Sequence, residues 1–316
     1  MKVNTLKALI LFAALHIVTT AEAISTTTAM TSLKPTASQN PLVIYGKDNR
    51  MDVFEDTDAS RRALAESVVA IVPASFIQKG PIDAIVNGSK YGEENNLCKS
   101  EKFWDQVAPA YCSGVLVADN IIATAGHCVM DTSFCASANF VFGFNINTQG
   151  KDPSKVKSED VYSCKRILHD EMVGDGADFA LVELDRPVVG RKPLRLANAA
   201  PKPAEDVFII GHPVGLPAKI ADGAKVRRHD NGFYVANLDS FGGNSGSPVF
   251  NSATHEIAGL LVRGEQDFKQ QGSSRCAVSY HCQDGLCRGE DVTNPDVVKN
   301  KLDAILSGGG AAAVLR

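Results

Sequence analysis

The chain has 316 residues and a formal net charge of −4, with 32 basic and 36 acidic side chains mixed along its length. No basic stripe or polybasic cluster is present in the sequence, which excludes the usual signature of a nucleic-acid-binding or membrane-surface protein. The length is sufficient for one large β domain or two small ones, because all-β domains can exceed about 200 residues.

The first residues have the pattern of a signal peptide. Lys2 and Lys7 form a short basic region, an apolar run covers 8–18, and the segment ends in Ala21-Glu22-Ala23. The apolar run is too short to span a bilayer and polar residues follow it directly, which disfavours the alternative of a membrane anchor. We therefore predict a signal peptide at 1–23 and a secreted or periplasmic mature protein, without membrane association after signal removal.

The rest of the chain has mostly the pattern of short strands. Residues 24–42 are rich in Ser, Thr and Ala without apolar periodicity, so we expect a linker or pro-segment there. Asp58 at the start of a run with Arg and Ala predicts a short helix over 58–66. Short apolar runs broken by Gly, Asn, Asp and Pro then indicate an antiparallel barrel or sandwich. The predicted strands are 67–72, 113–117, 121–123, 140–144, 164–168, 179–183, 207–210, 223–227, 233–236, 248–250 and 257–262.

Two further segments complete this organisation. The Pro-rich stretch 185–203 separates two sets of strands and is predicted to join two β units. Apolar residues with helical spacing after Pro295 predict a short C-terminal helix over 294–306, which the glycines at 308–310 end. We expect 307–316 to form a disordered tail.

All eight cysteines follow the predicted signal peptide. An even number of cysteines in an exported protein favours disulfides. The alternative is a metal site at Cys276, His281, Cys282 and Cys287, but this spacing matches no standard zinc pattern. We therefore expect disulfides, no metal and no cofactor.

Three short motifs contain residues suited to nucleophilic catalysis. His127 lies on a small-residue corner, Asp178 opens an apolar strand, and Ser245 lies in a glycine-flanked turn. A serine hydroxyl needs a base such as imidazole to take its proton, and an aspartate can hold that imidazole in the required tautomer. Each residue alone also fits a structural role, and Asp175 competes with Asp178. The three together predict a catalytic triad.

The motifs resemble those of the chymotrypsin-like (trypsin-fold) serine peptidases, and within that family the bacterial glutamyl-endopeptidase branch. The resemblance covers about 43–306 and rests on Tyr111-Cys112-Ser113-Gly114, Thr124-Ala125-Gly126-His127-Cys128, Asp178-Phe179-Ala180-Leu181 and Gly242-Gly243-Asn244-Ser245-Gly246-Ser247-Pro248. In addition, Val43-Ile44-Tyr45-Gly46 resembles a mature N-terminus of that branch.

The resemblance implies an all-β fold of two antiparallel six-stranded β-barrels, with the active site at their interface. The first barrel would cover about 66–186 and the second about 187–292. It also implies a serine endopeptidase that hydrolyses polypeptide substrates through an acyl-enzyme, and we expect it to be a monomer. Two alternatives are a catalytically silent peptidase-like binding protein and an esterase. All three triad residues are present, and the Ser–Asp–His order of α/β hydrolases is absent from the sequence.

The resemblance further assigns the backbone N–H groups of Gly243 and Ser245 to an oxyanion hole, for which glycine allows the required backbone conformation. It pairs Cys112 with Cys128 as the disulfide of the histidine loop. The other six cysteines allow fifteen pairings. Among these we select Cys135 with Cys164, and one bridge within 276–287.

The sequence departs from its relatives at three positions. Asn244 replaces the aspartate that pairs with the new N-terminus of trypsin, so activation of a zymogen, with a cut near 40–43, would need another route. Leu261 stands where glutamyl endopeptidases have a substrate-binding histidine. Asp239, followed by Ser240, stands where trypsin-like enzymes have the carboxylate that binds Arg or Lys. We predict cleavage after Arg or Lys; the alternatives are another preference, such as Glu, and a turn-capping or surface Asp239.

Overall fold

The computed structural model describes residues 44–131, 133–174, 176–264, 266–283 and 287–313. The predicted signal peptide, the linker or pro-segment, Val43 and Asp175 lie outside the described residues. Contacts divide the chain into residues 1–38 and 39–316, and all described residues belong to the second unit.

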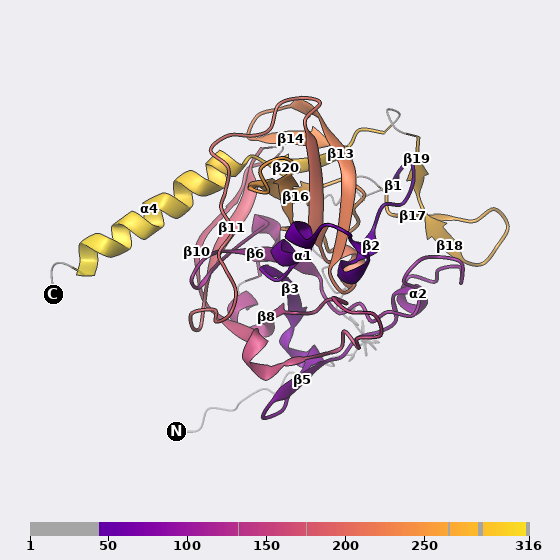
Figure 1. The fold of residues 1–316 in the computed structure, drawn as a ribbon, viewed down its shortest axis with the longest axis horizontal. Coiled ribbons are helices and arrows are strands. Elements are labelled where there is room, and N and C mark those ends of the chain that lie inside the picture. Colours follow the sequence, from indigo (N-terminus) through magenta and orange to yellow (C-terminus); the bar gives the residue numbers. More distant parts are fainter. Residues whose placement is uncertain (1–43, 132, 175, 265, 284–286, 314–316) are drawn as a thin grey trace, which may run out of the picture. The chain divides into compact units, whose positions relative to one another are not determined.

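The first barrel is closed by six antiparallel strands in the order β10-β11-β7-β6-β3-β8. Figure 1 labels five of them, β3, β6, β8, β10 and β11. All six correspond to strands predicted from the apolar runs before residue 186, and each contributes side chains to a core cluster that includes Ile71, Leu116 and Phe140. The strands are β3 (Val68–Pro73), β6 (Cys112–Ala118), β7 (Ile121–Thr124), β8 (Ala138–Phe142), β10 (Val161–Met172) and β11 (Asp178–Leu184).

The second barrel has the order β12-β15-β16-β20-β14-β13 and is closed by pairing of β12 with β13. The strands are β12 (Asp206–Gly211), β13 (Lys219–His229), β14 (Phe233–Ala236), β15 (Pro248–Asn251), β16 (Ile257–Arg263) and β20 (Glu290–Thr293). A short strand from the N-terminal segment, β2 (Met51–Asp52), adds to β13. The all-β fold of two six-stranded barrels is thus confirmed.

Strand β20 is the one barrel strand that the sequence analysis missed. Its sequence, Glu-Asp-Val-Thr, has no apolar alternation, yet all four residues are buried. The acids are accommodated because they have partners: Asp291 accepts a hydrogen bond from Arg263 Nε at 3.1 Å. A strand whose buried side chains are charged lacks the apolar pattern by which strands are predicted, because its burial depends on partners elsewhere in the chain.

The remaining elements connect or flank the barrels. The predicted helix at 58–66 is present as α1 (Ala59–Ala65), and the Asp58 side chain caps it by accepting the Ser60 N–H at 2.8 Å. The long connection from β3 to β6 contains η2 (Ala74–Phe76), β4 (Ile77–Lys79), β5 (Asp83–Val86) and α2 (Tyr91–Glu94), and β9 (Lys155–Lys157) joins β5. Other short elements are β1 (Ile44–Tyr45), η1 (Val53–Glu55), η3 (Gly126–Cys128), α3 (Phe134–Ser137), η4 (Ser158–Asp160), η5 (Pro213–Gly215), β17 (Phe268–Gln270), β18 (Ala277–Ser279) and β19 (His281–Cys282).

The C-terminal helix α4 (Pro295–Ala313) ends later than predicted. The apolar residues Val298 and Leu302 pack onto the main core, as their helical spacing predicts. The glycines at 308–310 do not stop the helix. Each glycine costs a helix roughly 1 kcal/mol relative to alanine, but the three alanines that follow are the strongest helix formers.

Four disulfides account for all eight cysteines. The structure pairs Cys112 with Cys128, as the resemblance implies, and it contains the selected bridges Cys135–Cys164 and Cys282–Cys287. Cys98–Cys276, which spans 178 positions, was not predicted. The cysteines considered as metal ligands are therefore bonded to sulfur.

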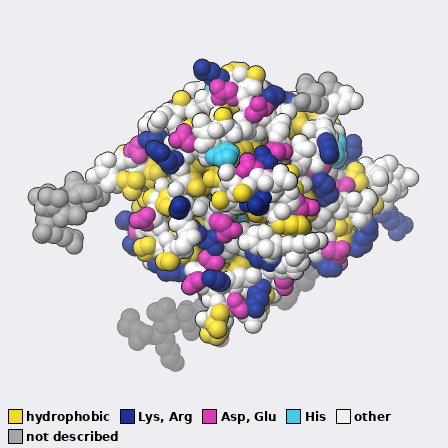
Figure 2. Space-filling view, in the orientation of Figure 1, with side chains coloured by type: hydrophobic (Ala, Val, Ile, Leu, Met, Phe, Trp, Pro, Cys, Tyr) yellow, Lys and Arg dark blue, Asp and Glu magenta, His cyan; other side chains and the backbone are white. Residues whose placement is uncertain are grey.

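The surface is mixed in charge, as the composition indicates. On the face shown in Figure 2, basic and acidic side chains are interspersed. In the part of the chain that the structure describes, no helix combines the length and apolar character needed to cross a membrane.

The disulfides are expected to differ in their contribution to stability. Replacing Cys98 and Cys276 together by Ser should lower the free energy of unfolding by about 5 kcal/mol, and replacing Cys282 and Cys287 by about 2 kcal/mol. The reason is that a crosslink restricts the unfolded chain more when the loop is longer, and these bridges span 178 and 5 positions. Urea unfolding of the two double variants would measure this; equal losses would contradict the loop-length argument.

Candidate active site

The histidine motif forms a tight corner at the end of β7. His127 lies in the turn η3, and the Cys112–Cys128 disulfide ties this turn to the start of β6. Gly126 is required for the close approach, because a Cβ there would lie 2.3 Å from the Glu171 carbonyl oxygen. The small residues of the motif therefore allow the corner to pack directly against the neighbouring strands.

Asp178 is the carboxylate that orients His127. It is buried at the start of β11, and its Oδ2 lies 2.7 Å from His127 Nδ1 while its Oδ1 accepts the His127 backbone N–H at 3.1 Å. With the carboxylate as acceptor, Nδ1 carries the proton and Nε2 of the neutral ring is left with its lone pair. This is the tautomer that a general base requires.

A residue of the second barrel holds Asp178 in place. The Thr293 hydroxyl, on β20, donates to the Asp178 carbonyl at 2.8 Å and accepts the Asp178 backbone N–H at 3.2 Å. Sequence analysis missed Thr293. No local signal identifies it, since the two residues are 115 positions apart.

The serine turn of the second barrel docks on strand β6 of the first. The Ser245 carbonyl oxygen accepts the Ser113 N–H at 2.8 Å, and Ser113 Oγ donates to the Gly243 carbonyl at 2.9 Å. Gly246 has φ of +83°, and a Cβ there would lie 2.2 Å from Thr124 Oγ1. Ser245 is thereby held beside the histidine corner, with its carbonyl oxygen 3.7 Å from Cys128 Sγ.

Gly243 has the conformation and surroundings expected of an oxyanion-hole residue. Its φ is +84°, and a Cβ would lie 2.8 Å from Gly215 N and from His212 O, so a side chain is excluded. Among the described residues, neither the Gly243 nor the Ser245 N–H has a hydrogen-bond acceptor. A cavity of about 320 Å³ opens against Gly242 and Gly243, with Tyr111 also in its wall.

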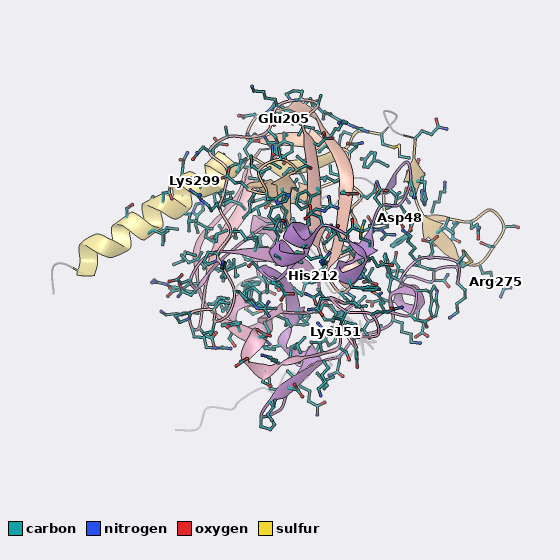
Figure 3. All side chains as sticks on the ribbon, in the orientation of Figure 1. Asp48, Lys151, Glu205, His212, Arg275 and Lys299 are labelled. Atoms are coloured by element: carbon teal, nitrogen blue, oxygen red, sulfur yellow. A yellow bond between two sulfur atoms is a disulfide. The ribbon has the colours of Figure 1, made fainter. Side chains whose placement is uncertain are left out.

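His212 lies behind the glycine pair and has a structural role. Figure 3 marks its position between the two barrels. Its N–H donates to Ser113 Oγ at 3.0 Å, its Nδ1–H donates to the Leu216 carbonyl at 2.9 Å, and its ring stacks on Phe144. Burial lowers its pKa to about 4, so the ring is neutral at physiological pH.

Asn244 is buried inside the serine turn. Its Oδ1 accepts the Ser247 hydroxyl at 3.2 Å, and its N–H donates to the Phe241 carbonyl at 3.1 Å. The side chain that replaces the aspartate of trypsin thus contributes to the turn itself.

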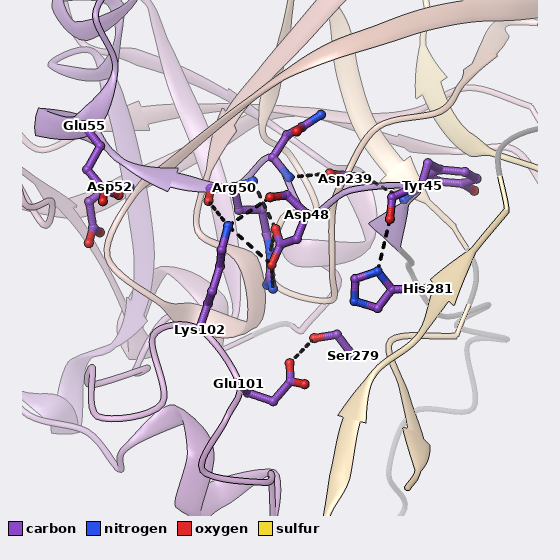
Figure 4. Close-up of polar contacts among 12 residues, drawn as sticks. Tyr45, Asp48, Arg50, Asp52, Glu55, Glu101, Lys102, Asp239, Ser279 and His281 are labelled. Carbon is purple, nitrogen blue, oxygen red and sulfur yellow. Dashed lines mark hydrogen bonds and ion pairs between the residues drawn. The ribbon is translucent and has the colours of Figure 1, made fainter.

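The structure places the predicted substrate-binding residues in different environments. Asp239 Oδ1 accepts the Tyr45 N–H at 2.7 Å and Oδ2 accepts the Asn49 N–H at 2.9 Å (Figure 4). Ser240 is buried and donates to Glu290 Oε2 at 3.1 Å. The Leu261 side chain packs in the core of the second barrel. Sequence analysis missed that residues 44–50 reach Asp239, because backbone donors carry no sequence signal.

One set of potential metal ligands lies near the site. Cys112, His127 and Cys128 have their ligand atoms within 4.8 Å of one another. The two sulfurs form a disulfide, which lacks the thiolate character that binds zinc.

Comparisons with known proteins agree with this architecture. The family model of the trypsin-like peptidase domain matches residues 112–260. The chain is similar to the structure of the scabies mite inactivated protease paralogue S-I1, at 15% identity and a TM-score of 0.50, over 84% of this chain and 99% of that one. It is also similar to a Glu endopeptidase in complex with MPD, at 17% identity and a TM-score of 0.47, over 83% and 99% of the two chains. No curated protein matches the chain.

The environment of Asp239 predicts a pH dependence of stability. Burial raises its pKa from 3.8 to about 6, although the Asn49 and Tyr45 amides oppose the shift. Between these values the folded state holds the proton more firmly than the unfolded state, so the contribution of Asp239 to stability falls as the pH rises from about 4 to 6. The fall is at most about 3 kcal/mol.

Urea unfolding of the wild type and Asp239→Asn across this pH range would measure the difference. The variant should gain stability relative to the wild type as the pH rises. Identical pH dependence in both proteins would show that the carboxylate is not perturbed.

Proposed function

We propose that the protein is an active serine endopeptidase, because residues 112–260 match the family model of the trypsin-like peptidase domain and the chain folds into two six-stranded antiparallel barrels. Ser245 is the nucleophile, His127 the general base and Asp178 the residue that orients the base. The observation that carries the proposal is the buried Asp178 carboxylate, which accepts both the Nδ1–H and the backbone N–H of His127.

Acylation follows from these roles. Ser245 Oγ attacks the carbonyl carbon of a peptide bond while its proton passes to His127 Nε2. Asp178 stabilises the imidazolium without taking its proton. The Gly243 and Ser245 N–H groups donate to the developing oxyanion, and each such donor contributes about 3 kcal/mol to transition-state stabilisation. Cleavage of the C–N bond releases the amine, which takes the proton from His127 and leaves an ester on Ser245.

Deacylation uses the same groups with water as the nucleophile. His127 Nε2 takes a proton from water as its oxygen attacks the ester, and the oxyanion again occupies the hole formed by Gly243 and Ser245. The proton then returns to Ser245 Oγ as the carboxylic acid product leaves. The substrates are polypeptides, and four disulfides support action in an oxidising, extracytoplasmic compartment.

A fluorophosphonate probe tests the nucleophile. We expect the processed protein to be labelled at Ser245 and the Ser245→Ala variant to lose labelling and peptidase activity, because the proposed mechanism forms the acyl-enzyme on Ser245 Oγ. Ser252→Ala, on the turn after β15, is the matched control and should label like the wild type. A processed wild type that takes up no label would favour the catalytically silent binding protein instead.

For the residue before the cleaved bond we propose Arg or Lys. Support comes from Asp239, six positions before Ser245, and from Glu290, which bonds the adjacent Ser240. Two backbone amides already donate to Asp239, but a carboxylate has about four lone-pair sites, so capacity for a cation remains. Burial raises the pKa of Asp239 and Glu290, and an incoming cation would favour their charged forms.

Peptides that differ only in this residue test the preference. We expect kcat/KM for Arg and Lys peptides to exceed that for Glu and Phe peptides by at least about 100-fold, because a buried carboxylate left without its cation is costly. Asp239→Asn should lose this advantage while keeping its low rate on the Phe peptide. A wild type that prefers Glu or Phe would refute the assignment.

A further inference from the structure

Both backbone groups of Gly242 are hydrogen-bonded, which restrains the two peptide units that meet at its Cα. The Gly242 carbonyl oxygen accepts the Val214 N–H at 2.5 Å, and the Gly242 N–H donates to Asp267 Oδ2 at 3.1 Å. In a planar trans peptide the C=O and the following N–H point in opposite directions. Fixing the Gly242 carbonyl against Val214 therefore directs the Gly243 N–H to the opposite side, toward the cavity.

Two consecutive glycines would not keep this orientation by themselves. Glycine has access to conformations on both sides of φ = 0, so a Gly-Gly peptide rotates more freely than any other. One restraint is the hydrogen bond from the Val214 N–H to the Gly242 carbonyl. Val214 has φ of +51°, which is uncommon for a β-branched residue. The other restraint comes from the second barrel, from the loop that carries Asp267.

Asp267 lies between β16 and β17 and is itself well anchored. Its carbonyl oxygen accepts the Tyr280 N–H at 2.8 Å, and the next residue, Phe268, packs its ring 5.5 Å from that of Phe241. Residues 267 and 268 thus contact 241 and 242 pairwise. The carboxylate is withdrawn from water, which raises its pKa to about 7, while the Gly242 N–H and the charge of Arg50 act in the opposite direction.

Residues 44–50, the N-terminal segment, contact Phe241, the residue on which Phe268 packs. The Arg50 guanidinium lies 4.0 Å from the centre of the Phe241 ring. Two hydrogen bonds to Asp48, at 3.0 and 2.9 Å, fix the guanidinium (Figure 4). Arg50, in residues 44–50, and Glu290, on β20, both act electrostatically on the Asp267 carboxylate. Arg50 favours the charged form of Asp267 and so lowers its pKa, whereas a charged Glu290 disfavours that form.

We propose that Asp267 is a positioning residue of the oxyanion hole: it holds the Gly242 N–H so that the Gly243 N–H is oriented before substrate arrives. This role rests on the proposed function. It acts on the transition state, because the ground-state substrate does not need the oxyanion donor. A displaced donor should therefore lower kcat and leave KM nearly unchanged.

Three variants test the role. Asp267→Ala removes the acceptor and should lower kcat and the rate of fluorophosphonate labelling by at least roughly tenfold. Asp267→Asn keeps a neutral acceptor oxygen, so its kcat should exceed that of Asp267→Ala and match that of the wild type below pH 7, where Asp267 is protonated. Gln266→Ala is the matched control, because this neighbouring side chain donates to the Phe268 carbonyl in the same loop, whereas the Gly242 N–H is bonded by Asp267. It should behave like the wild type.

The pH profile separates this role from a purely structural one. A charged Asp267 accepts the Gly242 N–H more strongly than a neutral one. The wild-type kcat should therefore rise with pH through a step near 7, the pKa of Asp267, and Asp267→Asn should lack this step. The Gly242 amide should exchange with solvent faster in Asp267→Ala than in the wild type.

The following results would overturn the positioning role of Asp267 or the proposed function. An Asp267→Ala variant with wild-type kcat and labelling rate, or with a loss confined to KM, overturns the role. If that variant does not fold, an Asp267→Asn variant with the wild-type pH profile overturns it equally. A wild type that neither cleaves peptides nor takes up the probe overturns the proposed function, and this role with it, whereas failure of the inference alone leaves the wild type active.

Discussion

The candidate site depends on one small side chain at the contact of the two barrels, Ser113. His127 and Asp178 belong to the first barrel and Ser245 to the second, so the site exists only if the barrels keep their register. Ser113 sets that register through three hydrogen bonds. Its N–H donates to the Ser245 carbonyl, its hydroxyl donates to the Gly243 carbonyl, and the same hydroxyl accepts the His212 backbone N–H. All three bonds are buried or nearly so, where an unmade hydrogen bond costs about 1–3 kcal/mol.

A second polar contact between the barrels acts at the other end of the site. Thr293 bonds both backbone groups of Asp178, and Asp178 in turn bonds both the ring and the backbone of His127. The orientation of His127, the proposed base, is therefore set from the second barrel, which also carries Ser245, the proposed nucleophile. Fully satisfied buried polar groups specify one arrangement in a way that apolar packing alone does not.

Features that depend on interactions between residues close in sequence could be predicted, whereas features that depend on residues far apart in sequence could not. Local patterns predicted every strand of the first barrel and five of the six in the second, and they selected His127 and Asp178, which the structure joins by hydrogen bonds, and Ser245 as candidates for the site. Strand β20 was missed because its buried acids are stabilised by partners far along the chain. Thr293 and Asp267 were missed for the same reason, since each acts on a backbone group of another segment. The docking of residues 44–50 was missed because backbone amides bond Asp239, and any residue could supply these donors.

Residues 44–50 also explain how the second barrel accommodates three buried acidic side chains. Burial raises the pKa of Asp239, Asp267 and Glu290, which means that each carboxylate is costly in its charged form. The segment supplies the opposing interactions: the Tyr45 and Asn49 amides and the Tyr45 hydroxyl donate to two of these acids, and the charge of Arg50 acts on the third. In trypsin the N-terminus acts on the residue before the nucleophile, whereas here Asn244 bonds within its own turn and the N-terminal segment bonds Asp239, five positions earlier. Removal of residues 44–50 would leave buried carboxylates without these donors, so the segment belongs to the site as much as the barrels do.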